Sequence, residues 1–175
     1  MNTDNWFDVC FGFQEGFGKV KENRKWNYIG KDGKLLSPTW FDYCFGFHNG
    51  FACVELGEKC NYIDDEGKLL SATWFDFCGD FQEGFACVKL NGKWNYIGND
   101  GNLLSDVWFD YAHDFSEGFA RICLDYEWNF IDKKGEYLLP FCVYAVSDFK
   151  DGFAKVKIHQ VCYSVDKEGG LHEYR

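Results

Sequence analysis

The side chains best suited to acid–base chemistry or metal binding include four histidines. They stand at four different positions of a repeated pattern: His48, His113, His159 and His172. The chain contains no nucleophile elbow, zinc-protease motif, P-loop or dinucleotide fingerprint. We therefore predict a protein that is not an enzyme, with no catalytic residue, no metal site and no cofactor.

One carboxylate recurs after each of four Trp-Phe pairs: Asp8, Asp42, Asp76 and Asp110. Glycoside hydrolysis would require two carboxyl groups made different by their surroundings. Repeated segments do the opposite, because they give every carboxylate the same environment. We expect each of these side chains to accept backbone N–H groups at a turn or strand end.

The acidic segment Asp64-Asp65-Glu66-Gly67 superficially resembles a calcium-binding loop. It lacks the alternating ligands and the distal glutamate that an EF-hand needs. We expect a turn with glycine at the left-handed position.

A column of tryptophans is the best candidate for binding: Trp6, Trp40, Trp74 and Trp108. Exposed indoles would offer stacking surfaces to a sugar, a base or a protein groove. Packing between repeats is the alternative, and the sequence leaves both open. Three basic residues could offset the acidity of the chain near an anionic ligand: Lys25, Lys93 and Arg121.

A period of thirty-four residues positions all these side chains. Five repeats follow without insertion or deletion, at residues 6–39, 40–73, 74–107, 108–141 and 142–175. A fixed period of this length indicates a repeat architecture. We predict one domain over residues 6–175.

Within the third repeat the apolar pattern has the period of two that is typical of β-strands. Residues 85–90 and 93–97 flank Asn91-Gly92, a strong signal for a hairpin with a type I′ turn. A two-residue loop predicts these cross-strand pairs: Leu90 with Lys93, Lys89 with Trp94, Val88 with Asn95, Cys87 with Tyr96, and Ala86 with Ile97.

This register gives the hairpin two different faces. The smaller face carries Ala86, Val88, Asn95 and Ile97, and the bulkier one carries Phe85, Cys87, Trp94 and Tyr96. Neighbouring repeats can stack bulky face on small face, as a propeller or solenoid requires. The second tryptophan column is then expected in the core: Trp26, Trp94 and Trp128.

We predict an all-β fold of five tandem hairpin repeats, with a closed propeller-like ring favoured over an open β-solenoid. The fifth repeat diverges, with Cys142-Val143-Tyr144 in place of Trp-Phe-Asp, whereas the first repeat is nearly regular. An open stack needs a capping repeat at each end, whereas a closed ring needs none.

The nine cysteines form no Cys-x-x-Cys motif, and their odd number favours reduced thiols in a cytoplasm. Two groups recur at equivalent repeat positions: Cys10, Cys44 and Cys78, and Cys53 and Cys87. We expect these residues to fill space as small apolar side chains.

The net charge of −10 disfavours binding to a nucleic-acid polymer or to an anionic membrane. The chain has no apolar run long enough for a membrane helix, and no signal peptide is expected at its N-terminus. Aromatic residues make up 21% of the chain, which is enough to supply both a core and a stacking surface. The sequence leaves the oligomeric state open.

The repeat pattern resembles the WG-repeat (KWG-repeat) family of bacteria and their phages. The matching residues in the third repeat are Phe81, Glu83, Gly84, Phe85, Ala86, Val88, Lys93, Trp94, Tyr96, Ile97 and Gly101. The resemblance implies β-rich repeats and a binding or scaffolding role, without a reaction. In place of the glycine that usually follows the family's tryptophan, this chain has Asn27, Asn61, Asn95 and Asn129. We expect asparagine to preserve an unusual backbone conformation there.

These observations predict a non-enzymatic binding module, with a protein-interaction scaffold as the first hypothesis. Its contacts are expected at the Trp6 column or at the loops around Gln82-Glu83. The alternative is sequestration of a nucleotide-like or sugar-like ligand in pockets between repeats.

Overall fold

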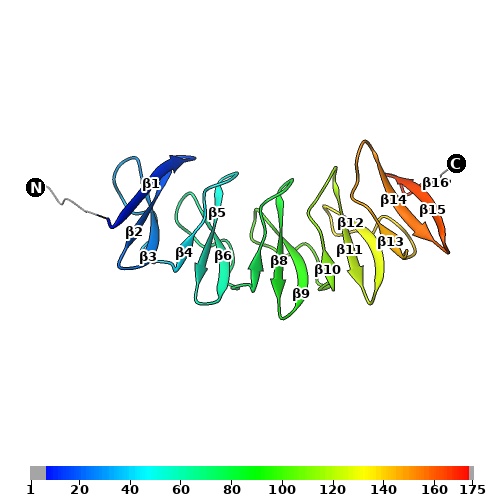
Figure 1. Ribbon diagram of the computed structural model, residues 1–175, viewed down its shortest axis with the longest axis horizontal. Helices are drawn as coiled ribbons and strands as arrows, with labels where there is room; N and C mark the ends of the chain where they lie inside the picture. The colour runs from blue at the N-terminus through cyan, green and yellow to red at the C-terminus, as the bar shows by residue number, and fades with distance from the viewer. Residues whose placement is uncertain (1–6, 174–175) are drawn as a thin grey trace, which may run out of the picture. The chain divides into compact units, whose positions relative to one another are not determined.

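Every regular element in the described part of the chain, residues 7–173, is a β-strand in this computed structural model (Figure 1). The predicted all-β fold is confirmed. The strands belong to two compact units, residues 1–78 (unit 1) and residues 79–175 (unit 2). The prediction of a single domain over residues 6–175 stays a prediction. Within residues 7–173 the structure shows no helix with the length and hydropathy needed to cross a membrane.

Unit 1 contains two antiparallel sheets, with strand orders β1-β2-β3 and β4-β5-β6. A short strand precedes a long hairpin in the second sheet, and a further short strand, β7, ends the unit. The strands are β1 (Val9–Gln14), β2 (Phe17–Glu22), β3 (Lys25–Gly30), β4 (Tyr43–Cys44), β5 (Phe51–Leu56), β6 (Lys59–Asp64) and β7 (Phe77–Cys78).

Unit 2 begins with the β8-β9 hairpin and continues with sheets of order β10-β11-β12 and β13-β14-β15-β16. The last sheet has an additional edge strand, β16, which pairs with β15. The strands are β8 (Phe85–Leu90), β9 (Lys93–Gly98), β10 (Tyr111–Ala112), β11 (Phe119–Leu124), β12 (Glu127–Asp132), β13 (Ala145–Val146), β14 (Phe153–Ile158), β15 (Val161–Asp166) and β16 (Leu171–Glu173).

The hairpin register predicted for the third repeat is confirmed at all five pairs. Strands β8 and β9 pair Leu90 with Lys93, Lys89 with Trp94, Val88 with Asn95, Cys87 with Tyr96, and Ala86 with Ile97. Asn91 and Gly92 have φ angles of 51° and 82°, as a type I′ turn requires. The loop length therefore sets the face on which each side chain lies.

The acidic segment at residues 64–67 is a turn, as expected. The carboxylate of Asp64 accepts hydrogen bonds from the backbone N–H groups of Glu66 at 3.0 Å and Lys68 at 2.8 Å. Gly67 has a φ of 83°, in the left-handed region that favours glycine.

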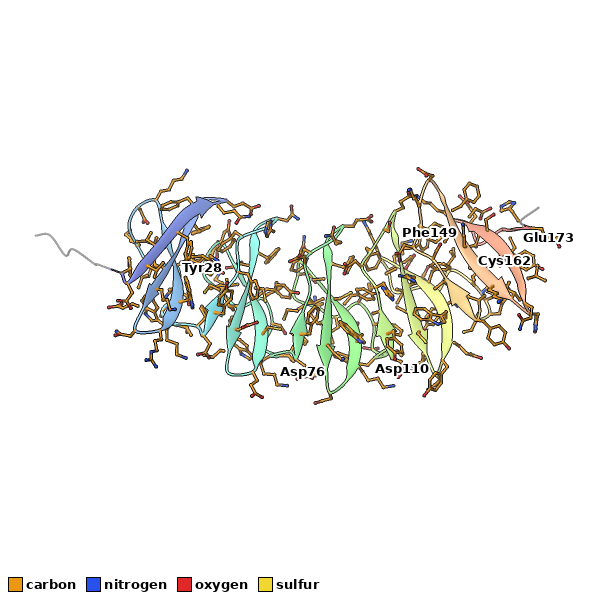
Figure 2. The ribbon with its side chains drawn as sticks, in the orientation of Figure 1. Tyr28, Asp76, Asp110, Phe149, Cys162 and Glu173 are labelled. Atoms are coloured by element: carbon orange, nitrogen blue, oxygen red, sulfur yellow. The ribbon has the colours of Figure 1, made fainter. Side chains whose placement is uncertain are left out.

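The bulky face of one hairpin packs on the small face of the next. In unit 1, Trp26 and Tyr28 of the first hairpin share a core with Ala52, Val54 and Ile63 of the second. Tyr28 is fully buried, and its hydroxyl donates to the carbonyl oxygen of Phe45 at 2.6 Å (Figure 2). This packing confirms the predicted pairing of unlike faces and supplies the apolar burial that one hairpin lacks alone.

The same packing recurs inside unit 2. Tyr96 joins Ala120, Ile122 and Ile131 in one core, and Phe130 joins the equivalent apolar residues of the fifth repeat in another. The second tryptophan column follows the prediction for Trp26, which is 9% exposed. Trp94 and Trp128 are half-buried and pack against the edges of the two cores.

The asparagine column differs from the expectation. None of the four residues has a positive φ, so they do not preserve an unusual backbone conformation. They are buried instead, and the Asn95 amide donates to the carbonyl oxygens of Ser105 at 2.7 Å and Val107 at 3.2 Å. The Asn95 side-chain oxygen accepts from the backbone N–H of Tyr96 at 2.8 Å. The side chain thereby holds the loop that leaves the hairpin, which glycine could not do.

Candidate functional site

Five exposed aromatic side chains lie on or beside β1, β4 and β7, and one of them, Phe13 on β1, is 50% exposed. The other four form the aromatic row: Phe11 (49% exposed), Tyr43 (40%), Phe45 (43%) and Phe77 (48%). Large apolar side chains that gather on a surface mark sites of interaction. The row is therefore the candidate functional surface of unit 1.

Ring contacts connect three members of the row through a core residue. Trp26 stacks on Phe11 with ring centroids 5.7 Å apart and meets the edge of Tyr43 at 5.7 Å. Tyr43 in turn meets Phe45 edge-on at 4.9 Å. Because Trp26 is buried, it holds the exposed rings against the core.

Two lysines of β2 lie over Trp26 and the rings that contact it. The Lys19 ammonium is 5.3 Å from the centroid of Phe11 and 5.6 Å from that of Tyr43. The Lys21 ammonium is 5.0 Å from the ring of Trp26. These cation–π contacts place positive charge on the aromatic surface at this repeat.

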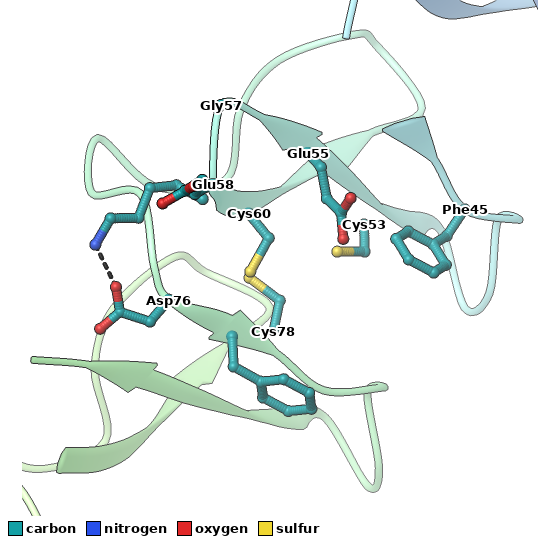
Figure 3. Close-up of a pocket in the computed structure, with 10 residues that line it drawn as sticks. Phe45, Cys53, Glu55, Gly57, Glu58, Cys60, Asp76 and Cys78 are labelled. Carbon is teal, nitrogen blue, oxygen red and sulfur yellow. Dashed lines mark hydrogen bonds and ion pairs between the residues drawn. The ribbon is translucent and has the colours of Figure 1, made fainter. Parts of the chain in front are cut away.

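At the equivalent place in the second repeat the surface opens into a cavity. The cavity has a volume of about 310 Å³ and lies between Phe45 and Phe77 (Figure 3). Cys53, Cys60 and Cys78 line it, with their sulfur atoms all within 4.8 Å of one another. Among the described residues this is the one group of three or more potential metal ligands that lie so close together.

The three thiols differ in their acidity. Hydrogen bonds from Cys53 and Cys78 lower the pKa of the Cys60 thiol. Hydrogen bonding to Cys60 raises the pKa of Cys53, and burial raises that of Cys78. A thiolate would therefore form first on Cys60.

An ion pair closes one side of the cavity. The Lys59 ammonium contacts the Asp76 carboxylate, and both residues line the cavity (Figure 3). Glu55 and Glu58 also line it. Since Asp76 balances Lys59, the two glutamates give this surface an acidic character.

In unit 2 an exposed ring again accompanies a tryptophan of the second column. Tyr111 is stacked on Trp128 with centroids 6.3 Å apart, and the His113 ring lies 6.0 Å from the same tryptophan. Burial lowers the pKa of His113, and the nearby Arg121 lowers it further. The imidazole therefore stays neutral at pH 7.

The described members of the first tryptophan column are neither fully exposed nor fully buried. Trp6 lies outside the described residues, and Trp40, Trp74 and Trp108 are half-buried. Trp74 packs against the core of unit 1. Binding by this column stays a prediction, and the more exposed rings are those of the aromatic row.

The basic residues proposed for ligand binding are engaged in contacts within the protein. Lys25 pairs with Asp42 at 2.6 Å, and Lys93 pairs with Asp110 at 2.5 Å. The Arg121 guanidinium bonds to Asp148 at 2.5 Å, and also to the Val146 carbonyl and His113. Their role in ligand binding stays a prediction.

The recurring aspartates accept backbone hydrogen bonds, as predicted. Asp8 accepts from the N–H of Asn23 at 3.0 Å, and Asp42 from that of Gly57 at 2.8 Å. Asp110 accepts from the N–H of Asp125 at 2.8 Å. The lysine partner and this backbone N–H lower the pKa of Asp110, and Asp42 is lowered in the same way.

The loop at Gln82-Glu83 is likewise connected to the next repeat of unit 2. The Glu83 carboxylate accepts from the N–H of Gly118 at 2.9 Å and pairs with Lys133 at 3.0 Å. A protein partner at this loop would compete with those contacts.

The repeat pattern of the WG containing repeat family matches five segments of the chain, at residues 7–26, 28–60, 62–94, 96–128 and 130–160. These segments cover most of the 175 residues. The chain belongs to the WG containing repeat family. Four of the five segments end at the second tryptophan column or at its equivalent, Cys60.

No curated protein sequence matches this WG-repeat chain. Among solved structures, Kluyveromyces lactis Hsv2 aligns with 92% of this chain and 61% of its own at 11% identity, with a TM-score of 0.46. The Neurospora crassa Pan2 WD40 domain aligns with 97% and 65% at 13% identity, with a TM-score of 0.37. The WG-repeat chain thus spans less than two thirds of the length of these structures.

A protein of unknown function from Bacteroides caccae aligns with 98% of the WG-repeat chain and 83% of its own at 15% identity, with a TM-score of 0.32. At these values the likeness does not define how the repeats are arranged.

Sequence reasoning missed both the aromatic row and the cysteine cluster of this WG-repeat protein. The row lies on strands as short as two residues, which are too short to show an alternating pattern. The signal for the cluster was Cys60, which replaces the tryptophan found at positions 26, 94 and 128.

Proposed function

We propose that this protein is a non-enzymatic binding module whose partner is another protein, and that the aromatic row of unit 1 is the contact surface. The observation that carries the proposal is the exposure of these four rings, two of which pack on buried Trp26. Aromatic residues are enriched at the centres of protein interfaces because they bury large areas at little entropic cost. Lys19 adds a positive group that suits an acidic or carbonyl-rich partner segment.

No catalytic role is proposed for the ionisable side chains. The repeated carboxylates bond to backbone N–H groups and to lysines, which explains their recurrence through the structure of the repeat. We place the protein in a reducing cytoplasm. All nine cysteines lie within residues 7–173, and all nine are free thiols, which supports this setting.

A double variant tests the contact surface. Phe11→Ser with Phe45→Ser removes two rings of the row, and Tyr126→Ser with Phe141→Ser removes two exposed rings of unit 2 as a matched control. Each protein is immobilised and exposed to a soluble extract, and retained proteins are compared by quantitative mass spectrometry. We expect a partner that binds the wild type and the control, but binds the row variant at least tenfold more weakly.

Equal retention by all three proteins would contradict the assignment of the row. Circular dichroism and the unfolding midpoint of each variant separate loss of binding from loss of fold.

The second candidate function is sequestration of a small nucleotide-like or sugar-like ligand. The cavity between Phe45 and Phe77 favours it, because its volume lies near the lower limit for small-molecule sites. A thermal-shift screen with nucleotides, cyclic dinucleotides and sugars tests this function. A ligand that raises the melting temperature by several degrees would favour sequestration over the scaffold.

We also propose that the five repeats close into a propeller-like ring. The packing of unlike faces inside each unit supports this arrangement, since a ring lets every repeat bury both faces of its hairpin.

A further inference from the structure

Three strands of unit 1 bring their cysteines to one point. Cys53 lies on β5, Cys60 on β6 and Cys78 on β7, and every pair of their sulfur atoms lies within 4.8 Å. Thiolates that share a tetrahedral zinc ion at bonds of about 2.3 Å lie about 3.8 Å apart. A small inward movement of the three side chains would therefore bring the sulfur atoms to the distances found around a bound zinc ion.

The second hairpin differs from the first at three positions around this cluster. Where the first hairpin has Lys19, Lys21 and Trp26, the second has Cys53, Glu55 and Cys60. Two cations and an indole are replaced by two thiols and a carboxylate. The Glu55 carboxylate lines the cavity and adds negative charge beside the thiols, which a bound cation would offset.

The third thiol belongs to a column that recurs in three repeats. Its counterpart in the second repeat, Cys44, is buried in the core that includes Trp26. In the third repeat, Cys87 stands with Trp94 and Ala112 and so has no thiol partners at these positions. The complete set of three cysteines therefore occurs once in the chain.

The cavity occupies the place that an indole fills in the first repeat. Trp26 contacts Phe11 and Tyr43, and the equivalent residues Phe45 and Phe77 line the cavity around Cys60. Replacement of tryptophan by cysteine thus creates space beside the sulfur atoms, enough for an ion with water or a small ligand.

We propose that Cys53, Cys60 and Cys78 bind one thiophilic divalent cation of the zinc class. Thiolates are preferred ligands of zinc, and three protein ligands leave a fourth position open toward the cavity. Three thiolates beside Glu55 and Glu58 make a strongly anionic pocket, which favours a divalent ion over a monovalent one. Lys59 does not offset this charge because it is paired with Asp76.

Bound metal would connect β7 to the β5-β6 hairpin and fix the positions of Phe45 and Phe77. The site would therefore organise the part of the aromatic row that lies over the second repeat. It does not depend on a protein partner, so the two proposals can fail separately.

A titration of the reduced, metal-free full chain with Co(II) tests the site. We expect one equivalent to bind, with thiolate-to-metal charge-transfer absorption, and an equivalent of Zn(II) to displace it. Saturation with Zn(II) is expected to raise the melting temperature, because the ion binds only the folded chain tightly.

The Cys60→Trp variant provides a sharp comparison, because it restores the residue found at positions 26, 94 and 128. We expect it to fold and to lose at least a hundredfold in metal affinity. Cys53→Ser, which is nearly isosteric, gives the same test without filling the cavity. The matched control is Cys142→Ser, which removes an exposed thiol in unit 2 and should bind as the wild type does.

Absence of charge-transfer absorption in the reduced wild type would overturn the proposal. So would equal binding by the wild type, Cys60→Trp and Cys53→Ser. Binding of Cu(I) without binding of Zn(II) or Co(II) would overturn the assignment of a divalent ion.

Discussion

One buried asparagine in each of four repeats stabilises the fold through hydrogen bonds to the backbone. Asn95 is fully buried and makes three hydrogen bonds to backbone groups. Asn27 and Asn61 repeat the pattern with the same kinds of partner. Each residue replaces bonds to water with bonds inside the protein, so its loss leaves buried backbone groups unsatisfied.

Replacement of Asn95 by Ala is therefore expected to lower the free energy of unfolding by about 2–3 kcal/mol. Urea unfolding followed by tryptophan fluorescence measures the change. Asn99→Ala, which alters an exposed asparagine in the following turn, is the control and should lie within about 0.5 kcal/mol of wild type. Equal changes in the free energy of unfolding for the two variants would show that the hydrogen bonds of Asn95 do not stabilise the fold.

The carboxylates at the hairpin turns predict a loss of stability in acid. The pKa of Asp110 is lowered in the folded protein, so its contribution is present above the unfolded value of about 3.9 and is lost as the pH falls through the lower folded value. Asp110→Asn should lower Tm at pH 7, and the difference from wild type should shrink below about pH 3.9.

Thermal unfolding from pH 7 to pH 2 measures this dependence. The matched control is Asp106→Asn, at an exposed position near the end of the preceding repeat. A constant difference between wild type and Asp110→Asn across the whole range would assign the effect to packing and not to ionisation.

At the scale of the element, the hairpin turns predict where stability can be gained. The β11-β12 turn places Asp125 and Tyr126 at φ values of 52° and 67°, where glycine is favoured. The Tyr126 side chain is 91% exposed, so its removal costs little packing. Tyr126→Gly is expected to raise the free energy of unfolding by about 0.5–1 kcal/mol.

The neighbouring residue supplies the control for this prediction. Glu127 is exposed but lies in a strand at an ordinary φ, so Glu127→Gly should lower stability by about 0.5–1 kcal/mol. The denaturant midpoints of both variants, compared with that of the wild type, measure these changes in stability. A loss of stability in both would show that backbone strain at Tyr126 is not relieved by glycine.

The hairpins could be predicted because the residues that determine their register are close together in the sequence. Asn91-Gly92 sets the loop length, the loop sets the register, and the register assigns every side chain to a face. The role of the asparagine column was not predictable in this way, because its partners lie ten and twelve residues away in a loop without a regular pattern.

The candidate surface was harder to predict for a related reason. The exposure of Phe45 and Phe77 depends on how a short strand packs against a neighbouring hairpin, which no period along the chain encodes. The meeting of Cys53, Cys60 and Cys78 depends on three strands, although Cys60 in a tryptophan column already marked the second repeat as different.

At the scale of the whole molecule, the proposed ring makes a prediction for solution scattering. A compact particle of 175 residues has a radius of gyration of about 16 Å. We expect the full chain to scatter with a value near this one. A clearly larger radius, with a correspondingly long maximum dimension, would favour the open β-solenoid.

The spacing between the turn carboxylates and their partners affects how the number of repeats in such a protein can change. Asp42 bonds to Lys25, seventeen residues before it, and to Gly57, fifteen residues after it. Asp110 has the same two offsets to Lys93 and Asp125. A duplicated segment of thirty-four residues would bring both partners with it, so gene duplication can add or remove whole repeats without leaving a carboxylate unpaired. Insertion of a single residue between the lysine and its aspartate would change this offset, so a constant repeat length keeps the ion pair in the same place in each copy.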